Sequence, residues 1–484
     1  MPDFAAFQNL LLSVVTRVNG TLWDYLLPAL LVGAGLWFTV RTRAVQVTML
    51  PALGRILRQR THEAETSGGL TPFEAFCVST GARVGVGNIA GIALAVTTGG
   101  PGAVFWMWVT AVIGASSGFA ESALAQLYKR KSPDGKGYQG GTAATIRYGL
   151  GSAFWAALFA VLLALADGLI FNSVLGNTRA ISLATTADVP RTVGGVLLAA
   201  YAAWVAWAGA KRLAKFATKL VPFMLALYLF LAFAVTLIYV DRIPEVLALI
   251  MRSAFTPEAA GGAGLWFILM TGVRRGLYSH EAGQGTVPNA AAAAECRHPV
   301  EQGFVQAAGV YVDTLLICTA TAMIVLLPGV DFAGQTGIEL VGRILSDAFG
   351  AYGAALGTFA AWALFLVVLF FALTSVIGNF FYSEMSLRVV TENRTLHLLF
   401  RAAVVAMVFA GSQMTLDLVW NLADLFMGVM VLVNLTAILR LGPVVFALLR
   451  DYRAQGGADG MAAGARFSKS RLPERLRRGV ALWD

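Results

Sequence analysis

The chain has 484 residues, of which 57% are hydrophobic and 13% are charged, and its formal net charge is +9. Soluble domains carry roughly 25% charged residues, so this composition excludes an ordinary soluble protein and indicates helices that cross a lipid bilayer. The basic residues lie between apolar segments and in the C-terminal tail. Membrane topology and anionic lipid account for them there, and they do not indicate a nucleic-acid-binding protein.

Eleven apolar segments have a length suited to crossing a bilayer as helices, which takes about 20 residues. They are predicted near residues 23–41, 72–98, 102–127, 151–178, 192–210, 216–240, 262–292, 302–328, 347–383, 396–411 and 415–447. The expected fold class is therefore an all-α membrane protein with 11 transmembrane helices.

Lys and Arg follow every second predicted span, and such residues mark cytoplasmic loops. They include Arg41, Arg43, Arg55, Arg58, Arg60, Lys129, Arg130, Lys136, Lys211, Arg212, Arg297, Arg388, Arg394, and in the tail Arg450, Arg466, Arg471 and Arg478. The remaining loops are short or carry acids such as Asp241, Glu245, Glu258, Asp331 and Glu339. This alternation predicts an N-terminus outside, a cytoplasmic C-terminus and an odd number of spans.

Two predicted spans are poor helices. Residues 81–91 contain four glycines, each costing about 1 kcal/mol relative to Ala inside a helix. Residues 274–285 place charged and polar groups where exposure to lipid would forbid them. Irregular backbone at membrane depth must line protein or a water-filled cavity, and paired interrupted spans indicate the binding site of a transporter. The alternative is that the glycines allow close helix packing, which is the favoured interpretation for Gly91, Gly114 and Gly118.

Each interrupted span opens a set of five spans, 72–240 and 262–447, so the two sets have opposite orientations. This is a five-plus-five inverted repeat, with the span near 23–41 as one extra N-terminal helix. The predicted division is 1–68 for the extra helix and a basic loop, 69–240 for the first repeat, 241–448 for the second, and 449–484 for a basic cytoplasmic tail.

Several long motifs resemble the alanine/glycine:cation symporter family, also called the sodium:alanine symporters, over nearly the whole chain from Gly69 to Leu441. The motifs are Ala-Arg-Val-Gly-Val-Gly-Asn-Ile-Ala-Gly at 82–91, Gly-Gly-Pro-Gly-Ala-Val-Phe-Trp-Met-Trp at 99–108, Phe-Ala-Glu-Ser at 119–122, Glu-Ala-Gly-Gln-Gly at 281–285, Val-Asp-Thr at 312–314 and Leu-Ala-Asp-Leu at 422–425. The resemblance implies a leucine-transporter-like fold in a bacterial inner membrane. It also implies sodium-driven uptake of small neutral amino acids such as alanine or glycine, with no catalytic chemistry and no cofactor besides the coupling ion.

In that fold a sodium ion lies between the first core helix and the eighth. By resemblance, its ligands here are the carbonyls of Gly81 and Val84 and the hydroxyls of Thr374 and Ser375. The alternative is that the two hydroxyls only bond to carbonyls one turn earlier in their own helix.

The predicted substrate site follows the first break. Free N–H groups near Val86, Gly87 and Asn88 suit a substrate carboxylate, and Tyr278 and Ser279 are expected to face them from the other broken helix. The side-chain oxygen of Asn88 is a candidate ligand for a second ion or for the substrate. Its alternative role is to cap the helix half that begins there.

Ionisable residues within spans are functional candidates. Arg83 is expected to be a structural or gating charge paired with an acid, either Glu281 or Glu121. His280 is read as a packing residue, with proton transfer as the alternative. A channel or an intramembrane enzyme is a remote alternative, because the inverted halves lie in one chain and no metal spacing or nucleophile motif is present.

The chain departs from the family pattern at three cavity-lining positions. Typical members carry Thr at the position of Val86, Gln at that of Leu175 and Trp at that of Asn379. The family run Gly-Gly-Pro-Met-Tyr-Tyr also reads Gly-Gly-Thr-Ala-Ala-Thr at 140–145. These changes favour a substrate larger than alanine, with a polar side chain that Asn379 recognises. The alternative is that neighbouring residues fill the space and alanine is still preferred.

Overall fold

The computed structural model describes residues 2–59, 68–133, 135, 137–187, 189–256, 264–332, 334–414, 416–456 and 465–483. Arg60, Lys136 and Glu258 of the predicted loop-charge pattern lie outside these residues. Within the described part the only strands are β1 (Arg130–Lys131) and β2 (Tyr138–Gln139), an antiparallel pair, and nearly all other regular structure is helical. The predicted all-α class is confirmed.

The elements fall into four consecutive groups, in which η denotes a 3-10 or π-helical turn. The first contains α1 (Pro2–Thr21), η1 (Leu22–Leu26), α2 (Leu27–Thr42), α3 (Val45–Thr48), η2 (Leu50–Ala52) and α4 (Leu53–Leu57). The second contains α6 (Pro72–Arg83), η3 (Gly87–Gly91), α7 (Ile92–Gly99), α8 (Gly102–Leu127), α9 (Thr142–Ala144), η4 (Thr145–Leu150), α10 (Ala153–Leu163), η5 (Ala164–Phe171), α11 (Asn172–Ala187), α12 (Arg191–Ala208) and α13 (Ala210–Ile238).

The third group contains η6 (Val240–Arg242), α14 (Ile243–Ser253), α15 (Gly264–His280), α16 (Pro288–Ala293), α17 (Pro299–Val310), η8 (Tyr311–Cys318), α18 (Thr319–Leu326), α19 (Gly337–Gly350), α20 (Ala354–Val390), α21 (Arg394–Gln413) and α22 (Leu416–Arg440). The last contains α23 (Gly442–Gln455), η10 (Lys469–Arg471) and η11 (Glu474–Leu476).

Nine helical segments in the described part are long and apolar enough to span a membrane, and the bent pair formed by α6 and η3–α7 makes up to ten. The first span is longer than predicted, at Leu10–Thr42, because α1, η1 and α2 run on as one helix. The predicted span near 262–292 is the 17-residue α15 followed by irregular backbone and α16. The count of 11 therefore stays a prediction.

The interruption in the first core helix is confirmed. α6 begins at Pro72 because Thr71 and Glu74 form a reciprocal capping box, with hydrogen bonds of 3.1 and 2.8 Å. It ends at Arg83, where Val84 leaves the helical region with ψ 82. The chain resumes after a bend of 50°.

The second interruption lies later than the sequence suggested. α15 stays helical through Arg274, Arg275 and His280, and the break begins at Glu281, whose φ is +55. Gly283 and Gly285 both have φ +86, a conformation that suits glycine because it has no Cβ.

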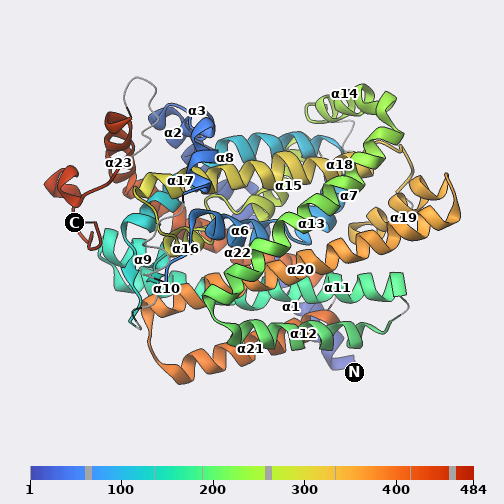
Figure 1. The fold of residues 1–484 in the computed structure, drawn as a ribbon. Coiled ribbons are helices and arrows are strands. Elements are labelled where there is room, and N and C mark those ends of the chain that lie inside the picture. Colours follow the sequence, from blue (N-terminus) through green and yellow to red (C-terminus); the bar gives the residue numbers. More distant parts are fainter. Residues whose placement is uncertain are drawn as a thin grey trace.

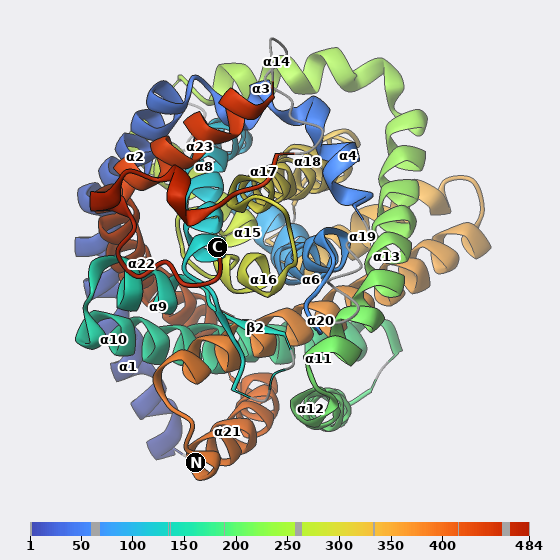
Figure 2. The ribbon, with the colours of Figure 1, turned by 60° about the vertical axis from the view of Figure 1, so that its left-hand side comes forward.

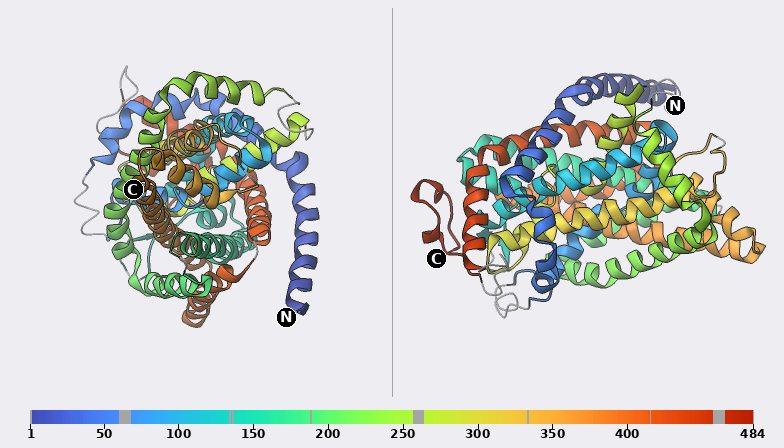
Figure 3. Two further views of the ribbon diagram at one scale, coloured as in Figure 1. Left: turned by 90° about the vertical axis from the view of Figure 1, so that its right-hand side faces the viewer. Right: turned by 90° about the horizontal axis from the view of Figure 1, so that it is seen from above.

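The helices pack as two groups. We name α6–α8 and α15–α18 the bundle group, and α9–α12, α20 and α21 the scaffold group. The two groups contact each other mainly where α6 packs on α20, and α13 touches both of these helices. Figure 2 shows α6, α15, α16 and α17 near the middle of the molecule. The two ends of the described chain lie at opposite ends of the helices (Figures 1 and 3).

Candidate functional site

The two broken helices meet beside Gly87. A Cβ built on Gly87 would lie only 2.5 Å from Cε1 of Tyr278, so the backbone of η3 rests against that ring. The neighbouring Val86 and Asn88 are fully buried. The structure thus brings together the predicted substrate residues at the first break with Tyr278 on α15.

Near this contact, a buried carboxylate accepts hydrogen bonds from residues of three elements. Asp313 in η8 accepts them from Asn88 Nδ2 at 2.6 Å, Ser279 Oγ at 2.5 Å and Thr314 Oγ1 at 2.8 Å. Asp313 is fully buried, and no basic side chain in the described part lies within ion-pair distance of it. Its direct contacts are therefore all neutral donors, and the Arg83 charge acts on it only from beyond ion-pair distance, an arrangement that favours a cation beside the carboxylate.

Asn88 also forms a hydrogen bond across the interruption of the helix. Its Oδ1 accepts a hydrogen bond of 3.0 Å from the backbone N–H of Gly85 on the other side of the interruption. No side-chain cap bond is made at the start of η3. The capping role considered for Asn88 is therefore wrong, and its side chain instead joins Gly85 to Ser279 and Asp313.

Gly81, Thr374 and Ser375, three of the residues predicted for the sodium site, lie together where α6 packs on α20. Ser375 Oγ is 3.3 Å from the carbonyl oxygens of both Gly81 and Ala82. Thr374 Oγ1 makes bonds of 3.1 Å to the carbonyls of Phe370 and Phe371 within its own helix, the alternative considered above. Val84 is the residue at which α6 ends.

Asn379 on α20 is paired across the helices. Its Nδ2 donates to Oδ1 of Asn172, the first residue of α11, over 3.1 Å, and Asn172 Nδ2 bonds the carbonyl of Gly168 over 3.0 Å. Leu175 is buried one turn further along α11. Asn172 was missed by the sequence reasoning, although an Asn between Phe171 and Leu175 in an apolar span is itself a signal.

Two aromatic rings pack near Tyr278. Its ring lies 5.1 Å from that of Phe171 and 4.7 Å from that of Trp420 on α22. Above Trp420, the Arg275 guanidinium lies 4.9 Å from the ring and binds the Asp424 carboxylate, with Nη2 2.6 Å from Oδ2. This buried ion pair joins α15 to α22 and was not foreseen.

Arg83 forms no direct ion pair with an acid among the described residues. Arg83 Nη1 instead donates to the carbonyl of Gln306 over 3.1 Å, because the C-terminal end of α6 points toward α17. Glu121 accepts from Gly283 N and from Asn434 Nδ2, and Glu281 accepts from Thr286 Oγ1. The direct pairing predicted for Arg83 with Glu281 or Glu121 is therefore not formed, although the Arg83 charge acts on both carboxyls electrostatically.

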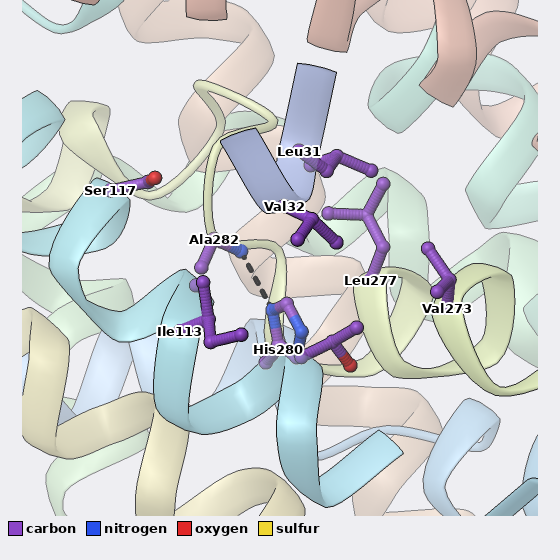
Figure 4. Close-up of a pocket in the computed structure, with 10 residues that line it drawn as sticks. Leu31, Val32, Ile113, Ser117, Val273, Leu277, His280 and Ala282 are labelled. Atoms are coloured by element: carbon purple, nitrogen blue, oxygen red, sulfur yellow. Dashed lines mark hydrogen bonds between the residues drawn. The ribbon is translucent and has the colours of Figure 1, made fainter. Parts of the chain in front are cut away.

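His280 packs as expected rather than facing the site. Its Nδ1 accepts a hydrogen bond of 3.0 Å from Ala282 N, and the ring lines a small apolar cavity with Leu31, Ile113 and Leu277 (Figure 4). The cavity measures about 20 Å³, which is room for about one water molecule and excludes an amino acid.

Two broken helices that meet at a buried polar cluster in an all-helical membrane protein define a secondary transporter. The described fold matches that of MhsT in complex with L-phenylalanine, with a TM-score of 0.53, 15% sequence identity, and 84% of this chain and 94% of that chain covered. A manganese transporter from Eremococcus coleocola matches with a TM-score of 0.52 and 14% identity, over 83% of both chains. The leucine-transporter-like architecture is confirmed.

The family model of the sodium:alanine symporters matches residues 8–464. The chain belongs to this family and is a transporter of amino acids, not an enzyme. It is 43% identical to the probable sodium/glutamine symporter GlnT of Bacillus subtilis, with 93% of this chain and 92% of that protein covered. It is 33% identical to the sodium/alanine symporter AgcS of Methanococcus maripaludis, with 90% and 95% covered.

Proposed function

We propose that this protein couples the entry of sodium to the uptake of a neutral amino acid by alternating access across a bacterial inner membrane. The observation that carries the proposal is the buried Asp313 carboxylate, which touches hydroxyl and amide groups and pairs with no cation among the described residues. A sodium ion prefers hard oxygen ligands, and Asp313, Ser279 and Thr314 offer a carboxylate and two hydroxyls within one cluster.

The contact between α6 and α20 is the proposed position of a second ion. The carbonyls of Gly81 and Val84 lie at the end of α6, where helix hydrogen bonds stop and carbonyl oxygens become available to a ligand. Ser375 already reaches two of these carbonyls, those of Gly81 and Ala82, so a modest approach of Thr374 would complete a ring of neutral oxygens. Such a site holds an ion without adding a fixed charge.

The substrate would lie at the break in α6, with its carboxylate on the N–H groups around Gly87 and Asn88 and with Tyr278 beside it. The N-terminus is proposed to lie outside and the C-terminus in the cytoplasm, as the loop charges indicate. The division into repeats at 69–240 and 241–448 is part of the same proposal.

Uptake into proteoliposomes tests the coupling ion. Labelled alanine and glutamine should accumulate under an inward sodium gradient at fixed pH. If accumulation persists when potassium or choline replaces sodium, and instead follows a proton gradient, the sodium assignment is refuted.

Changing Thr374 and Ser375 together to Ala should raise the sodium concentration for half-maximal uptake. Losing two neutral oxygen ligands costs about 2 kcal/mol, or roughly 30-fold in that concentration. Thr358→Ala is a matched control, because Thr358 lies on the same helix and its hydroxyl bonds only the carbonyl of Ala354. An unchanged sodium dependence in the double variant would remove these residues from the site.

A larger, polar substrate is the second candidate, and the Asn172–Asn379 pair favours it. Two neighbouring amide side chains offer one another's donors and acceptors, and a substrate carboxamide can replace either partner bond for bond. That the relative named as a probable sodium/glutamine symporter shares 43% identity supports the same reading. Under this candidate the physiological substrate is glutamine or asparagine rather than alanine.

Asn379→Trp should then shift preference from glutamine toward alanine. The lost hydrogen bond costs a ligand that needs it about 1–3 kcal/mol, so the uptake ratio of glutamine to alanine should fall roughly 5- to 150-fold. Competition of all common amino acids against labelled alanine gives the baseline. Inhibition by alanine and glycine alone, in the unmodified protein, would refute the larger substrate.

A further inference from the structure

The C-terminal segment 465–483, called the tail segment below, is folded onto one end of the helices rather than extended along lipid (Figure 2). Four of its apolar side chains are at most 8% exposed, Phe467, Leu472, Val480 and Trp483. The segment also closes on itself, with Lys469 N donating to Trp483 O and the Arg477 guanidinium bonding the carbonyls of Ser470 and Leu472. It is therefore a folded unit with a buried face.

The tail segment contacts the bundle group through hydrogen bonds and an aromatic ring. Trp483 Nε1 donates to the carbonyl of Gln126, near the end of α8, over 3.3 Å. The ammonium of Lys129 lies 5.4 Å from the centre of the same indole ring. Phe467 N donates over 3.0 Å to the carbonyl of Arg297, in the link between α16 and α17.

Gln126 and Lys129, which contact Trp483, also bind backbone where the ends of both broken helices meet. Gln126 Nε2 and Lys129 Nζ donate to the carbonyl of Ala294, directly after α16, at 2.8 and 2.7 Å. Leu70, before α6, joins that point through Leu70 N to Ala293 O at 2.9 Å and Glu295 N to Leu70 O at 2.7 Å. The tail segment thus sits on the layer that holds α6 and α16 together.

The other side of the tail segment rests on the scaffold group. A Cβ on Gly479, whose φ is +74, would lie within 3.1 Å of Tyr148 Cβ in η4. A Cβ on Gly151, before α10, would lie 3.1 Å from Arg478 Cζ. Arg130 links the two, donating to Gly479 O over 2.6 Å while its guanidinium lies 4.0 Å from the Tyr148 ring.

A polar contact at the other end of the tail segment completes the attachment. Arg471 Nη1 lies 3.3 Å from Asp451 Oδ1 on α23, and Asp451 Oδ2 lies 3.2 Å from His298 Nε2 at the start of α17. Burial by itself raises the pKa of Asp451, but the hydrogen bonds and charges of His298 and Arg471 outweigh it and hold that pKa below its usual value. The carboxylate therefore stays ionised at neutral pH.

We propose that the tail segment is a latch across the bundle–scaffold seam, which must release before that end of the molecule opens. The inference rests on the proposed alternating access, in which one helix group rocks against the other. A segment bound to both groups is strained or detached by that motion, so it favours the closed arrangement and slows opening. Trp483 is its anchor, because buried aromatic residues dominate such contacts.

Cys296 supplies a native reporter of opening. Its thiol is buried between Ala294 and Arg297, next to the point where Phe467 binds. Inside-out vesicles containing the full chain are treated with an impermeant maleimide, and labelling at Cys296 is followed by mass spectrometry. In Trp483→Ala the labelling rate and the amino acid exchange rate should both rise, by roughly tenfold.

Trp155→Ala is the matched control, because Trp155 on α10 is 51% exposed and makes no latch contact, and it should label like the unmodified protein. Phe467→Ala is a second variant that weakens the latch elsewhere. Unchanged Cys296 labelling in both latch variants would overturn the proposal. Uptake measured in the same vesicles distinguishes the latch from the proposed sodium coupling. If uptake does not depend on sodium but the latch variants still label faster, the sodium assignment is refuted and the latch proposal stands.

Discussion

Replacing Asp313 with Asn should remove nearly all sodium-driven uptake at ordinary sodium concentrations. Asn keeps the size of the side chain and one acceptor oxygen, but it removes the charge that Asn88, Ser279 and Thr314 surround. Interactions with a charged group contribute about 1.5–3 kcal/mol, so the sodium concentration for half-maximal uptake should rise roughly 10- to 150-fold. Uptake of labelled substrate measured over a wide sodium range gives this value directly.

Asp347→Asn is the matched control, since Asp347 lies on α19 with its side chain 62% exposed and should show the unmodified sodium dependence. Retention of a single symmetrical elution peak in detergent would show that Asp313→Asn remains folded. A variant that is folded and has normal sodium affinity would mean that no ion binds at Asp313. Uptake that follows the proton gradient in the unmodified protein but not in Asp313→Asn would instead favour a carboxyl that is protonated during transport.

The span pattern and the first break could be predicted because both follow from local chemistry. Long apolar runs dictate membrane helices, and a capping box at Thr71 and Glu74 fixes where α6 starts. The four glycines pointed to the break, although only Gly85 lies in it and the others are helical. The clustering of Gly81 with Thr374 and Ser375 needed the family resemblance, since nothing in either segment specifies that α6 packs on α20.

Side-chain partners were harder to predict because the sequence does not show which of several candidate groups lies nearest in space. Arg83 had two acids to choose from and bonds a carbonyl of α17 instead, an acceptor that every residue carries and no motif reveals. The helix α15 keeps Arg274 and Arg275 in regular structure because Asp424, far away in sequence, balances Arg275. Tertiary contacts of this kind decide where a helix tolerates charge.

The π-helical turns were likewise not predictable from the sequence pattern. η3, η5 and η8 carry Asn88, Phe171 and Asp313, three residues that meet around Tyr278 and Ser279. A π turn inserts one residue into a helix and so re-aims the side chains on one face, and such turns recur at functional sites. Apolar periodicity gave no sign of them, because a single inserted residue barely changes the pattern over a span.

Replacing Gly87 with Leu should leave the protein inserted in the membrane but inactive in uptake. The reason is space and not backbone conformation, because Gly87 lies in a helical turn and a Cβ there would already be 2.5 Å from Tyr278. A larger side chain must push the Tyr278 ring into Phe171 and Trp420, or displace η3 from the substrate position. A shift of about 1 Å at such a site costs roughly 100-fold in rate.

Gly33→Leu is the matched control for Gly87→Leu, because Gly33 lies on α2 with nothing within 4 Å of a built Cβ, and it should transport normally. Gly87→Ala separates the two ways of failing. If the ring can turn aside, Ala should retain partial uptake with a raised half-saturating substrate concentration, since only the substrate loses room. If η3 itself moves, Ala should lose uptake as Leu does and should also weaken sodium binding, because Asn88 is the next residue and bonds Asp313 directly. Normal uptake by both variants would show that Gly87 serves packing alone.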